Sequence, residues 1–176
     1  DLMTPLVKSL SGALRLCGLW EKARPFAEGL ECGLVRGLNN DFRYWARADQ
    51  LPPEPLSWNS WLVLGGRGSG KTRTGAEYVK AIATGLWPDV PPARRIAIVA
   101  PTFDEARMVM IEGESGLLAV HKDDSERPKF EPSKRLITWP NGAIAQVFTA
   151  EEPDGLRGPQ FDAAWCDELA KWKHGE

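Results

Sequence analysis

The residues with the clearest chemical potential form the stretch GGRGSGKT at positions 65–72. It matches the pattern G-x-x-x-x-G-K-[ST], in which backbone N–H groups converge on phosphate oxygens at a distance that larger side chains would block. Lys71 would place a positive charge against the β- and γ-phosphates, and the Thr72 hydroxyl would bind Mg²⁺. The predicted nucleotide-binding residues are Gly65, Gly66, Arg67, Gly68, Ser69, Gly70, Lys71 and Thr72.

The segments on either side of this loop decide between a phosphate site and an ordinary glycine-rich turn. The apolar residues 61–64 (WLVL) predict a buried strand, and a helical pattern runs from Thr72 to about Gly85. A helix that starts at the loop adds unpaired N–H groups and the positive end of its dipole. We therefore predict a site for ATP and Mg²⁺.

Arg67, inside the loop, has two interpretations that the residues alone leave open. It is a solvated arginine at a loop tip, or it acts as a γ-phosphate sensor or cis arginine finger that stabilises transition-state charge.

A second set of candidate residues follows the apolar residues 163–166, where Asp167 and Glu168 stand side by side. Alone, such a pair marks only the end of a strand. Downstream of a phosphate loop it is typical of a nucleotide hydrolase. The first acid would hold Mg²⁺, and the second would orient and deprotonate the attacking water. We therefore predict that Asp167 binds the metal and that Glu168 is catalytic.

Composition excludes several other classes of protein. The chain has 176 residues, 43% of them apolar, a length that allows one globular domain with a core. A net charge of −2 gives no bulk signature of nucleic-acid binding, although a local basic stripe is compatible with it. The cysteines (Cys17, Cys32 and Cys166) are odd in number and lack C-x-x-C spacing, so we expect buried thiols in a reducing compartment. No apolar run has the length of a membrane span, and the cytoplasm is the expected location.

The elements that must position these residues follow an α/β pattern. We expect a helical segment over residues 1–50, a proline-rich linker over 51–60 and the phosphate-loop core over 61–176. Short apolar strands alternating with helices predict a mixed, mostly parallel sheet covered on both faces. Further strands are expected at 95–100, 136–139, 143–149 and 163–166, with a PNG hairpin between the second and third, and a loop and helix over 101–120.

Three motifs together resemble the large terminase subunit of tailed bacteriophages, and more narrowly the terminases of prophages and gene-transfer-agent particles. These are GGRGSGKT, the APT at 100–102, and LRGPQFDAAWCDELAKW at 156–172. The resemblance implies a P-loop NTPase of the additional-strand, catalytic-glutamate type. In that family this ATPase drives double-stranded DNA into an empty capsid, and a C-terminal nuclease domain cuts the DNA.

The resemblance also assigns roles to single positions. Lys71 and Thr72 match the phosphate-loop pair, Arg67 matches a loop arginine that many terminases carry, and Asp167 and Glu168 match the metal-binding and catalytic acids.

Three further positions are less specific. Gln50 lies where terminases have an adenine-contacting motif. The APT segment resembles one that faces nucleic acid in related motors, although a simple turn explains it alone. Arg157 would approach the nucleotide or a neighbouring subunit, or would form a structural ion pair.

The sequence departs from the family at its end. In the family's fold another strand follows the acidic pair and inserts between the phosphate-loop strand and the acidic strand. Without it the two strands pair directly, or a partner chain supplies the strand, or the chain is a fragment. We expect a fragment with an incomplete sheet, which hydrolyses ATP slowly or not at all.

Three functions compete at this stage. The first is a DNA-packaging ATPase motor, whose partners would be double-stranded DNA, the terminase small subunit, the portal and procapsid, and further copies in a ring, with no membrane. The second is a silent remnant that binds nucleotide or packaging partners without turnover. The third is a helicase-like P-loop ATPase outside packaging, which the run at 156–172 disfavours.

Overall fold

The structure, a computed structural model, describes residues 40–54 and 58–172 of the chain. The chain divides into two compact units, Asp1–Ala46 and Arg47–Glu176. In the first unit the described part is a short 3₁₀-helix, η1 (Phe42–Tyr44), whose N-terminus is capped by the Asp41 carboxylate. Of the helical segment predicted over residues 1–50, residues 1–39, with Cys17 and Cys32, lie outside the described residues.

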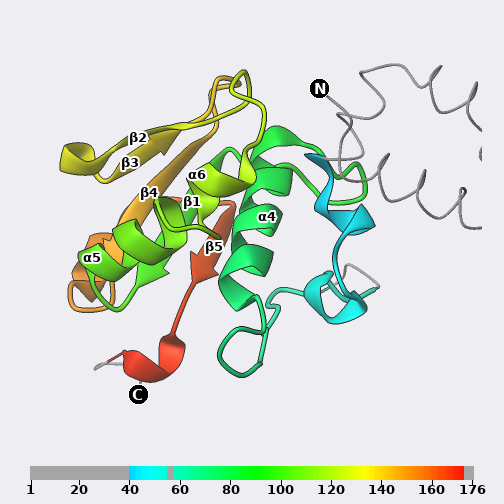
Figure 1. Cartoon of the computed structure of the whole chain (residues 1–176). Coiled ribbons are helices and arrows are strands. Elements are labelled where there is room, and N and C mark those ends of the chain that lie inside the picture. Colours follow the sequence, from blue (N-terminus) through cyan, green and yellow to red (C-terminus); the bar gives the residue numbers. More distant parts are fainter. Residues whose placement is uncertain (1–39, 55–57, 173–176) are drawn as a thin grey trace, which may run out of the picture. The chain divides into compact units, whose positions relative to one another are not determined.

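The second unit is built on a five-stranded mixed sheet (Figure 1). Its spatial order is β2-β3-β4-β1-β5. Strands β4 and β5 pair with β1 in parallel, and β3 pairs with β2 and with β4 in antiparallel. The predicted α/β class and mixed sheet are confirmed, but only half of the strand pairings are parallel, not most of them. The strands are β1 (Arg95–Ala100), β2 (Lys129–Glu131), β3 (Leu136–Thr138), β4 (Ile144–Thr149) and β5 (Ala163–Cys166).

The sequence predicted four of these strands within a residue at each end. The PNG hairpin is present: Gly142 adopts a left-handed φ of 85° and its N–H donates to the Trp139 carbonyl. Asn141 ties this hairpin to the main helix, because its side-chain amide donates to the Ala83 carbonyl at 2.7 Å. The three-residue strand β2 was not predicted, since no period can be read from so short a run.

The two faces of the sheet are covered differently. Side chains of β1 alternate between the faces, and Ile96 and Ile98 are fully buried. One face is covered by a helical layer, made of the helix after the glycine loop and the helical segments that follow β1, all described below. These helices contact one another, and one of them also contacts β1. On the other face Ala97 and Val99 pack with Phe148, and this cluster is covered by the side chains of Leu156, Phe161 and Trp172.

The main helix of that layer is α4 (Lys71–Thr84), which begins directly after the glycine loop and ends at Gly85 in the left-handed conformation. The predicted helix is thus confirmed. Figure 1 shows α4 beside β5, and the contact is close, because a Cβ at Gly75 would overlap the indole of Trp165.

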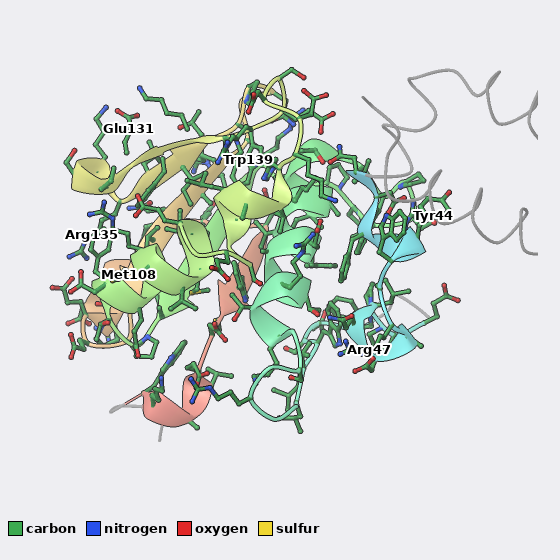
Figure 2. The ribbon with its side chains drawn as sticks, in the orientation of Figure 1. Tyr44, Arg47, Met108, Glu131, Arg135 and Trp139 are labelled. Atoms are coloured by element: carbon green, nitrogen blue, oxygen red, sulfur yellow. The ribbon has the colours of Figure 1, made fainter. Side chains whose placement is uncertain are left out.

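The expected helix after β1 is interrupted. It divides into α5 (Phe103–Glu105), a π-helix η3 (Ala106–Ile111) and, after a turn, α6 (Leu117–Val120). Met108 of the π-helix is 70% exposed (Figure 2). The other short elements are 3₁₀-helices: η2 (Ala48–Gln50), η4 (Pro132–Lys134), η5 (Pro153–Leu156) and η6 (Leu169–Lys171).

Two strand predictions were wrong in part. Residues 61–64 form no strand, and Leu62 and Leu64 are 66% and 82% exposed. Strand β5 is present but lies at the sheet edge, and Ala164 and Cys166 are exposed, so Cys166 is not the buried thiol expected. Within the described sheet β5 pairs only with β1, which rules out direct pairing between 61–64 and β5 there. An apolar run becomes a strand only where a neighbour satisfies its backbone groups.

Within the described ranges no helix is long and apolar enough to cross a membrane.

Candidate nucleotide site

The glycine loop of residues 65–70 wraps ahead of the first turn of α4. Gly68 and Gly70 have φ values of 77° and 87°, a left-handed backbone that glycine adopts without strain. Lys71 is the first helical residue, and its ammonium donates to the carbonyls of Gly65 at 2.8 Å and Gly66 at 3.1 Å. The lysine charge is therefore held over the loop, where a phosphate group would meet it.

Ser69 has a buried hydroxyl with no hydrogen-bond partner among the described residues. It lies against Gly65, where a Cβ would overlap it. A buried polar atom without a partner is costly unless something satisfies it, and an anion in the loop would do so. This arrangement fits a bound phosphate chain.

Gln50, predicted as a base-contacting residue, lies beside the loop. Its side chain is 7% exposed, and its amide nitrogen is 2.7 Å from where a Cβ of Gly70 would stand. Its carbonyl oxygen accepts from the Arg47 N–H at 3.2 Å. The structure thus brings Gln50 and the loop together from positions about twenty residues apart in the chain.

The acidic pair follows β5 at the carboxyl end of the sheet. The Asp167 N–H donates to the Val99 carbonyl at 3.0 Å, which continues the pairing with β1. Burial raises the pKa of Asp167, a hydrogen bond from the Glu168 N–H and the positive charge of Lys71 oppose the rise, and the charge of Glu168 adds to it. The loop lysine is thus near enough for its charge to act on the Asp167 carboxylate.

Glu168 has a left-handed backbone, with φ 51° and ψ 44°, although it is not glycine. Such a conformation costs on the order of 1 kcal/mol and persists only where the surroundings impose it. Here the turn after it imposes the conformation: the Lys171 N–H donates to the Glu168 carbonyl, and the Trp172 indole N–H donates to the Asp167 carbonyl. The exposed carboxylate of Glu168 therefore projects from a fixed turn.

Lys171 links this turn to the helical layer. Its ammonium lies 3.2 Å from a Glu105 carboxylate oxygen and 3.9 Å from one of Glu168. The hydrogen bond to Glu105, together with the nearby negative charges, raises the pKa of Lys171.

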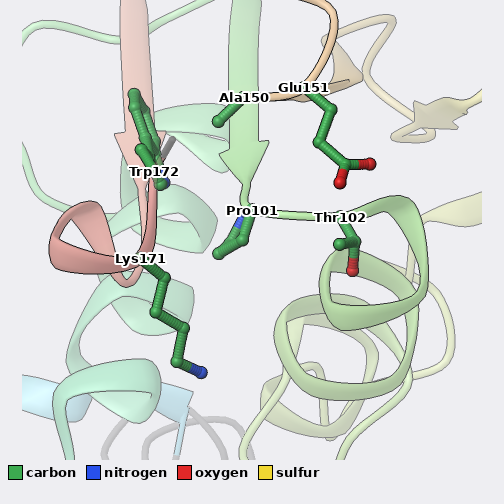
Figure 3. Close-up of a pocket in the computed structure, with 6 residues that line it drawn as sticks. All are labelled: Pro101, Thr102, Ala150, Glu151, Lys171 and Trp172. Atoms are coloured by element: carbon green, nitrogen blue, oxygen red, sulfur yellow. The ribbon is translucent and has the colours of Figure 1, made fainter. Parts of the chain in front are cut away.

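A pocket of about 220 Å³ opens beside this link (Figure 3). Figure 3 shows Lys171 and Trp172 on one side and Thr102 across from them. It is lined by Pro101, Thr102, Ala150, Glu151, Lys171 and Trp172.

Comparison with known families shows where the chain belongs. Residues 62–176 match the family model for the N-terminal part of the terminase large subunit, T4-like virus type. The chain belongs to this family of terminase large subunits. Neither a curated protein nor a solved structure gives a significant match. The predicted resemblance to phage terminases is thereby confirmed, and the matched terminase segment includes the loop, the sheet and the acidic pair.

Three further predicted positions take clear places in this terminase domain. Thr102 of the APT segment caps α5 by accepting from the Glu105 N–H at 3.2 Å, so the segment is a strand-to-helix turn. Arg157 forms an ion pair with Asp154 at 3.2 Å, and its side chain is 86% exposed. Of its predicted roles, the structure therefore shows the structural ion pair. Arg67 is exposed at the loop tip, and this position agrees with both of its interpretations.

No cluster of three or more histidine, cysteine, aspartate or glutamate side chains that could hold a metal occurs within residues 40–54 and 58–172. Thr72 and Asp167 remain the predicted Mg²⁺ ligands. A site of one hydroxyl and one carboxylate suits this ion, which keeps several waters and takes further oxygens from nucleotide phosphates.

Sequence reasoning missed two residues of this terminase site, Arg47 and Lys171. Arg47 donates to the Ser69 carbonyl in the loop at 2.7 Å, and Lys171 contacts Glu168 as described. Lys171 lies in the LAKW run that carried the resemblance, so a signal existed for it. Arg47 belongs to no such motif, and only the fold shows its contact.

Proposed function

We propose that this chain is the ATPase part of a phage-type terminase large subunit, which couples hydrolysis of Mg·ATP to the movement of double-stranded DNA into a procapsid. The observation that supports it most directly is the terminase family match over residues 62–176, a segment that contains both the glycine loop and the acidic pair. Lys71 starts α4 at the end of the glycine loop, and its charge acts on the Asp167 carboxylate after β5.

The proposed roles follow from this geometry. The loop N–H groups and the Lys71 ammonium bind the phosphate chain, and Lys71 exchanges its contacts with the Gly65 and Gly66 carbonyls for phosphate oxygens. Thr72 and Asp167 hold Mg²⁺. Glu168 orients the attacking water from its fixed turn. Gln50 contacts the base.

Around this site we propose the partners of a packaging motor: DNA, the small subunit, the portal and procapsid, and further copies of the chain in a ring. Its place would be the cytoplasm of a bacterial host.

A second function has one specific observation in its favour. Residues 61–64 are not a strand, and Leu62 and Leu64 are exposed, so the loop lacks the rigid strand expected in front of it. A chain in this form would bind nucleotide without turning it over.

One assay separates the two functions. Phosphate release from Mg·ATP is measured with and without double-stranded DNA, for the unmodified chain, Lys71→Ala and Glu168→Gln. Turnover that is lost in both variants supports the motor. Nucleotide binding that only Lys71→Ala weakens, with no turnover, supports the silent form. No binding by the unmodified chain contradicts both.

A further inference from the structure

Arg47, the residue before the short helix η2, contacts the glycine loop; Figure 2 labels Arg47. The guanidinium of Arg47 donates from Nη2 to the Ser69 carbonyl at 2.7 Å, across 22 positions of the chain. The same guanidinium is held by the Asp49 carboxylate, with contacts of 3.1 Å from Nε and 3.3 Å from Nη2. Arg47 therefore joins two partners, one of which is the backbone of the loop.

Gln50 contacts the same part of the loop. Its buried amide nitrogen stands 2.7 Å from the Cβ position of Gly70, whose φ is 87°. Its carbonyl oxygen accepts from the backbone N–H of Arg47, which fixes the Gln50 side chain next to that residue. Arg47 and Gln50 thus flank a single peptide group, the one between Ser69 and Gly70.

The orientation of that peptide bears on phosphate binding. In a planar trans peptide the carbonyl and the N–H point in opposite directions. With the Ser69 carbonyl held by Arg47 on the outside of the loop, the Gly70 N–H is directed to the opposite side. A cationic donor on the carbonyl also polarises the peptide and makes its N–H a stronger donor to an anion.

We propose that Arg47 is a positioning residue for the phosphate loop: it fixes and polarises the Ser69–Gly70 peptide so that the Gly70 N–H donates to a nucleotide phosphate. This inference rests on the proposed nucleotide function and adds to it a residue outside the loop motif. Asp49 supports the role by holding the guanidinium fork. Lysine is a poor substitute, because one ammonium lacks the planar fork that spans a carboxylate and a carbonyl together.

A simpler explanation is a surface ion pair between Arg47 and Asp49. Their side chains are 57% and 69% exposed, and such pairs contribute little. An ion pair alone predicts no effect on ligand binding. A direct contact from Arg47 to the adenine base is a third explanation, and it predicts an effect on ATP but none on a ligand without a base.

The test compares two ligands that share only the phosphate chain. Displacement of a fluorescent ATP analogue by Mg·ATP and by Mg·pyrophosphate is measured for the full chain and for Arg47→Ala, Arg47→Lys, Asp49→Asn and Lys71→Ala. Arg107→Ala is the matched control, because Arg107 is an exposed arginine paired with one carboxylate, Glu112, on the π-helix. Urea unfolding of each variant shows whether it is folded.

We expect Arg47→Ala to weaken both ligands by the same factor, roughly fivefold to twentyfold, because the loop loses its preorganisation. Arg47→Lys should recover part of this loss, Asp49→Asn should weaken both ligands by a smaller factor, and Arg107→Ala should bind as the unmodified chain does. If Arg47→Ala does not fold, the Asp49→Asn variant is the test: its affinities for Mg·ATP and Mg·pyrophosphate should fall by equal factors.

Three results would overturn the inference. Loss of ATP affinity with unchanged pyrophosphate affinity would place Arg47 on the base. Unchanged affinity for both ligands would leave only the surface ion pair, while a weakened Lys71→Ala would still support the proposed function. Binding that Lys71→Ala does not weaken, or no binding at all, would remove the nucleotide site and this inference with it.

Discussion

His121 links α6 to the hairpin through a hydrogen-bond pattern that fixes its protonation state. Its Nδ1 lies 2.7 Å from the Leu117 carbonyl, and its Nε2 accepts from the Trp139 indole N–H at 3.0 Å. Since a carbonyl only accepts, Nδ1 must carry the proton and Nε2 must be bare. A second proton on Nε2 would face the indole N–H, donor against donor.

The imidazole is 3% exposed, and burial lowers its pKa from 6.5 to about 4. The Leu117 hydrogen bond opposes this shift, and the charges of Lys80 and Arg127 add to it. Because the unfolded chain binds this proton more tightly than the folded chain, unfolding takes up a proton in this range and the native state loses stability as pH falls from 6.5 towards 4. Between about pH 7 and about pH 4.5 the loss is roughly 2–3 kcal/mol, and most of the effect is reached once the pH is below both pKa values.

The assay is urea unfolding of the unmodified chain and of His121→Gln over the range from about pH 7 to about pH 4.5. Other carboxylates titrate in both proteins, so the difference between the two isolates the imidazole. We expect the stability advantage of the unmodified chain to shrink by roughly 2–3 kcal/mol over this range. An NMR titration, with the His121 signal assigned from the variant, should show no protonation near pH 6.5. A midpoint near 6.5 in the folded chain, or an unchanged difference in stability, would refute the reasoning.

Three further predictions concern packing and the turn after β5. Ile98→Ala should lower the free energy of unfolding by about 2–5 kcal/mol, because Ile98 is fully buried in β1. Leu64→Ala should change it by less than about 0.5 kcal/mol, because Leu64 is 82% exposed. Equal losses of stability in urea titrations would mean that residues 61–64 are packed as a core strand. Gly75→Ala should cost about 1–3 kcal/mol, because the new methyl group overlaps the Trp165 indole, and unchanged urea stability would contradict this close contact of α4 with β5. Lys171→Ala should change stability by less than about 1 kcal/mol, because its side chain is 55% exposed, and a larger loss of thermal stability would show that its ion pairs brace the fold.

The sequence predicted best those elements whose signals are local. The helix after the loop, α4, needs only a helical spacing of its apolar residues and a glycine at its end. The sequence has both, and the glycine is Gly85. The hairpin was encoded by PNG, because Gly142 supplies the left-handed turn residue and the Asn141 side chain accepts from the Ala143 N–H. Strand β1 was encoded by its unbroken apolar run, which fits a central strand buried on both faces.

The sequence failed where the outcome depends on a neighbour. Residues 61–64 are as apolar as a central strand, yet they pair with none of the described strands. The exposed positions of β5 have the same origin, since an edge strand with no cover on one face leaves alternate side chains in water. Arg47 could not be predicted for the same reason, because no sequence pattern relates a residue to a backbone carbonyl 22 positions away.

The two halves of the candidate site therefore depend on different sources of order. The loop half is built mainly from local features, glycines with left-handed backbones and the start of one helix, to which Arg47 adds a contact from an earlier part of the chain. The acidic half depends on tertiary contacts at both ends of β5. Before the strand, the Asp162 carboxylate accepts from the N–H groups of Arg94 and Arg95, which aligns β5 with β1. After it, Trp172 packs on the sheet and holds the turn that fixes Glu168. Of the two proposed properties, nucleotide binding would thus be the more robust, and hydrolysis would depend on how firmly the edge strand is held.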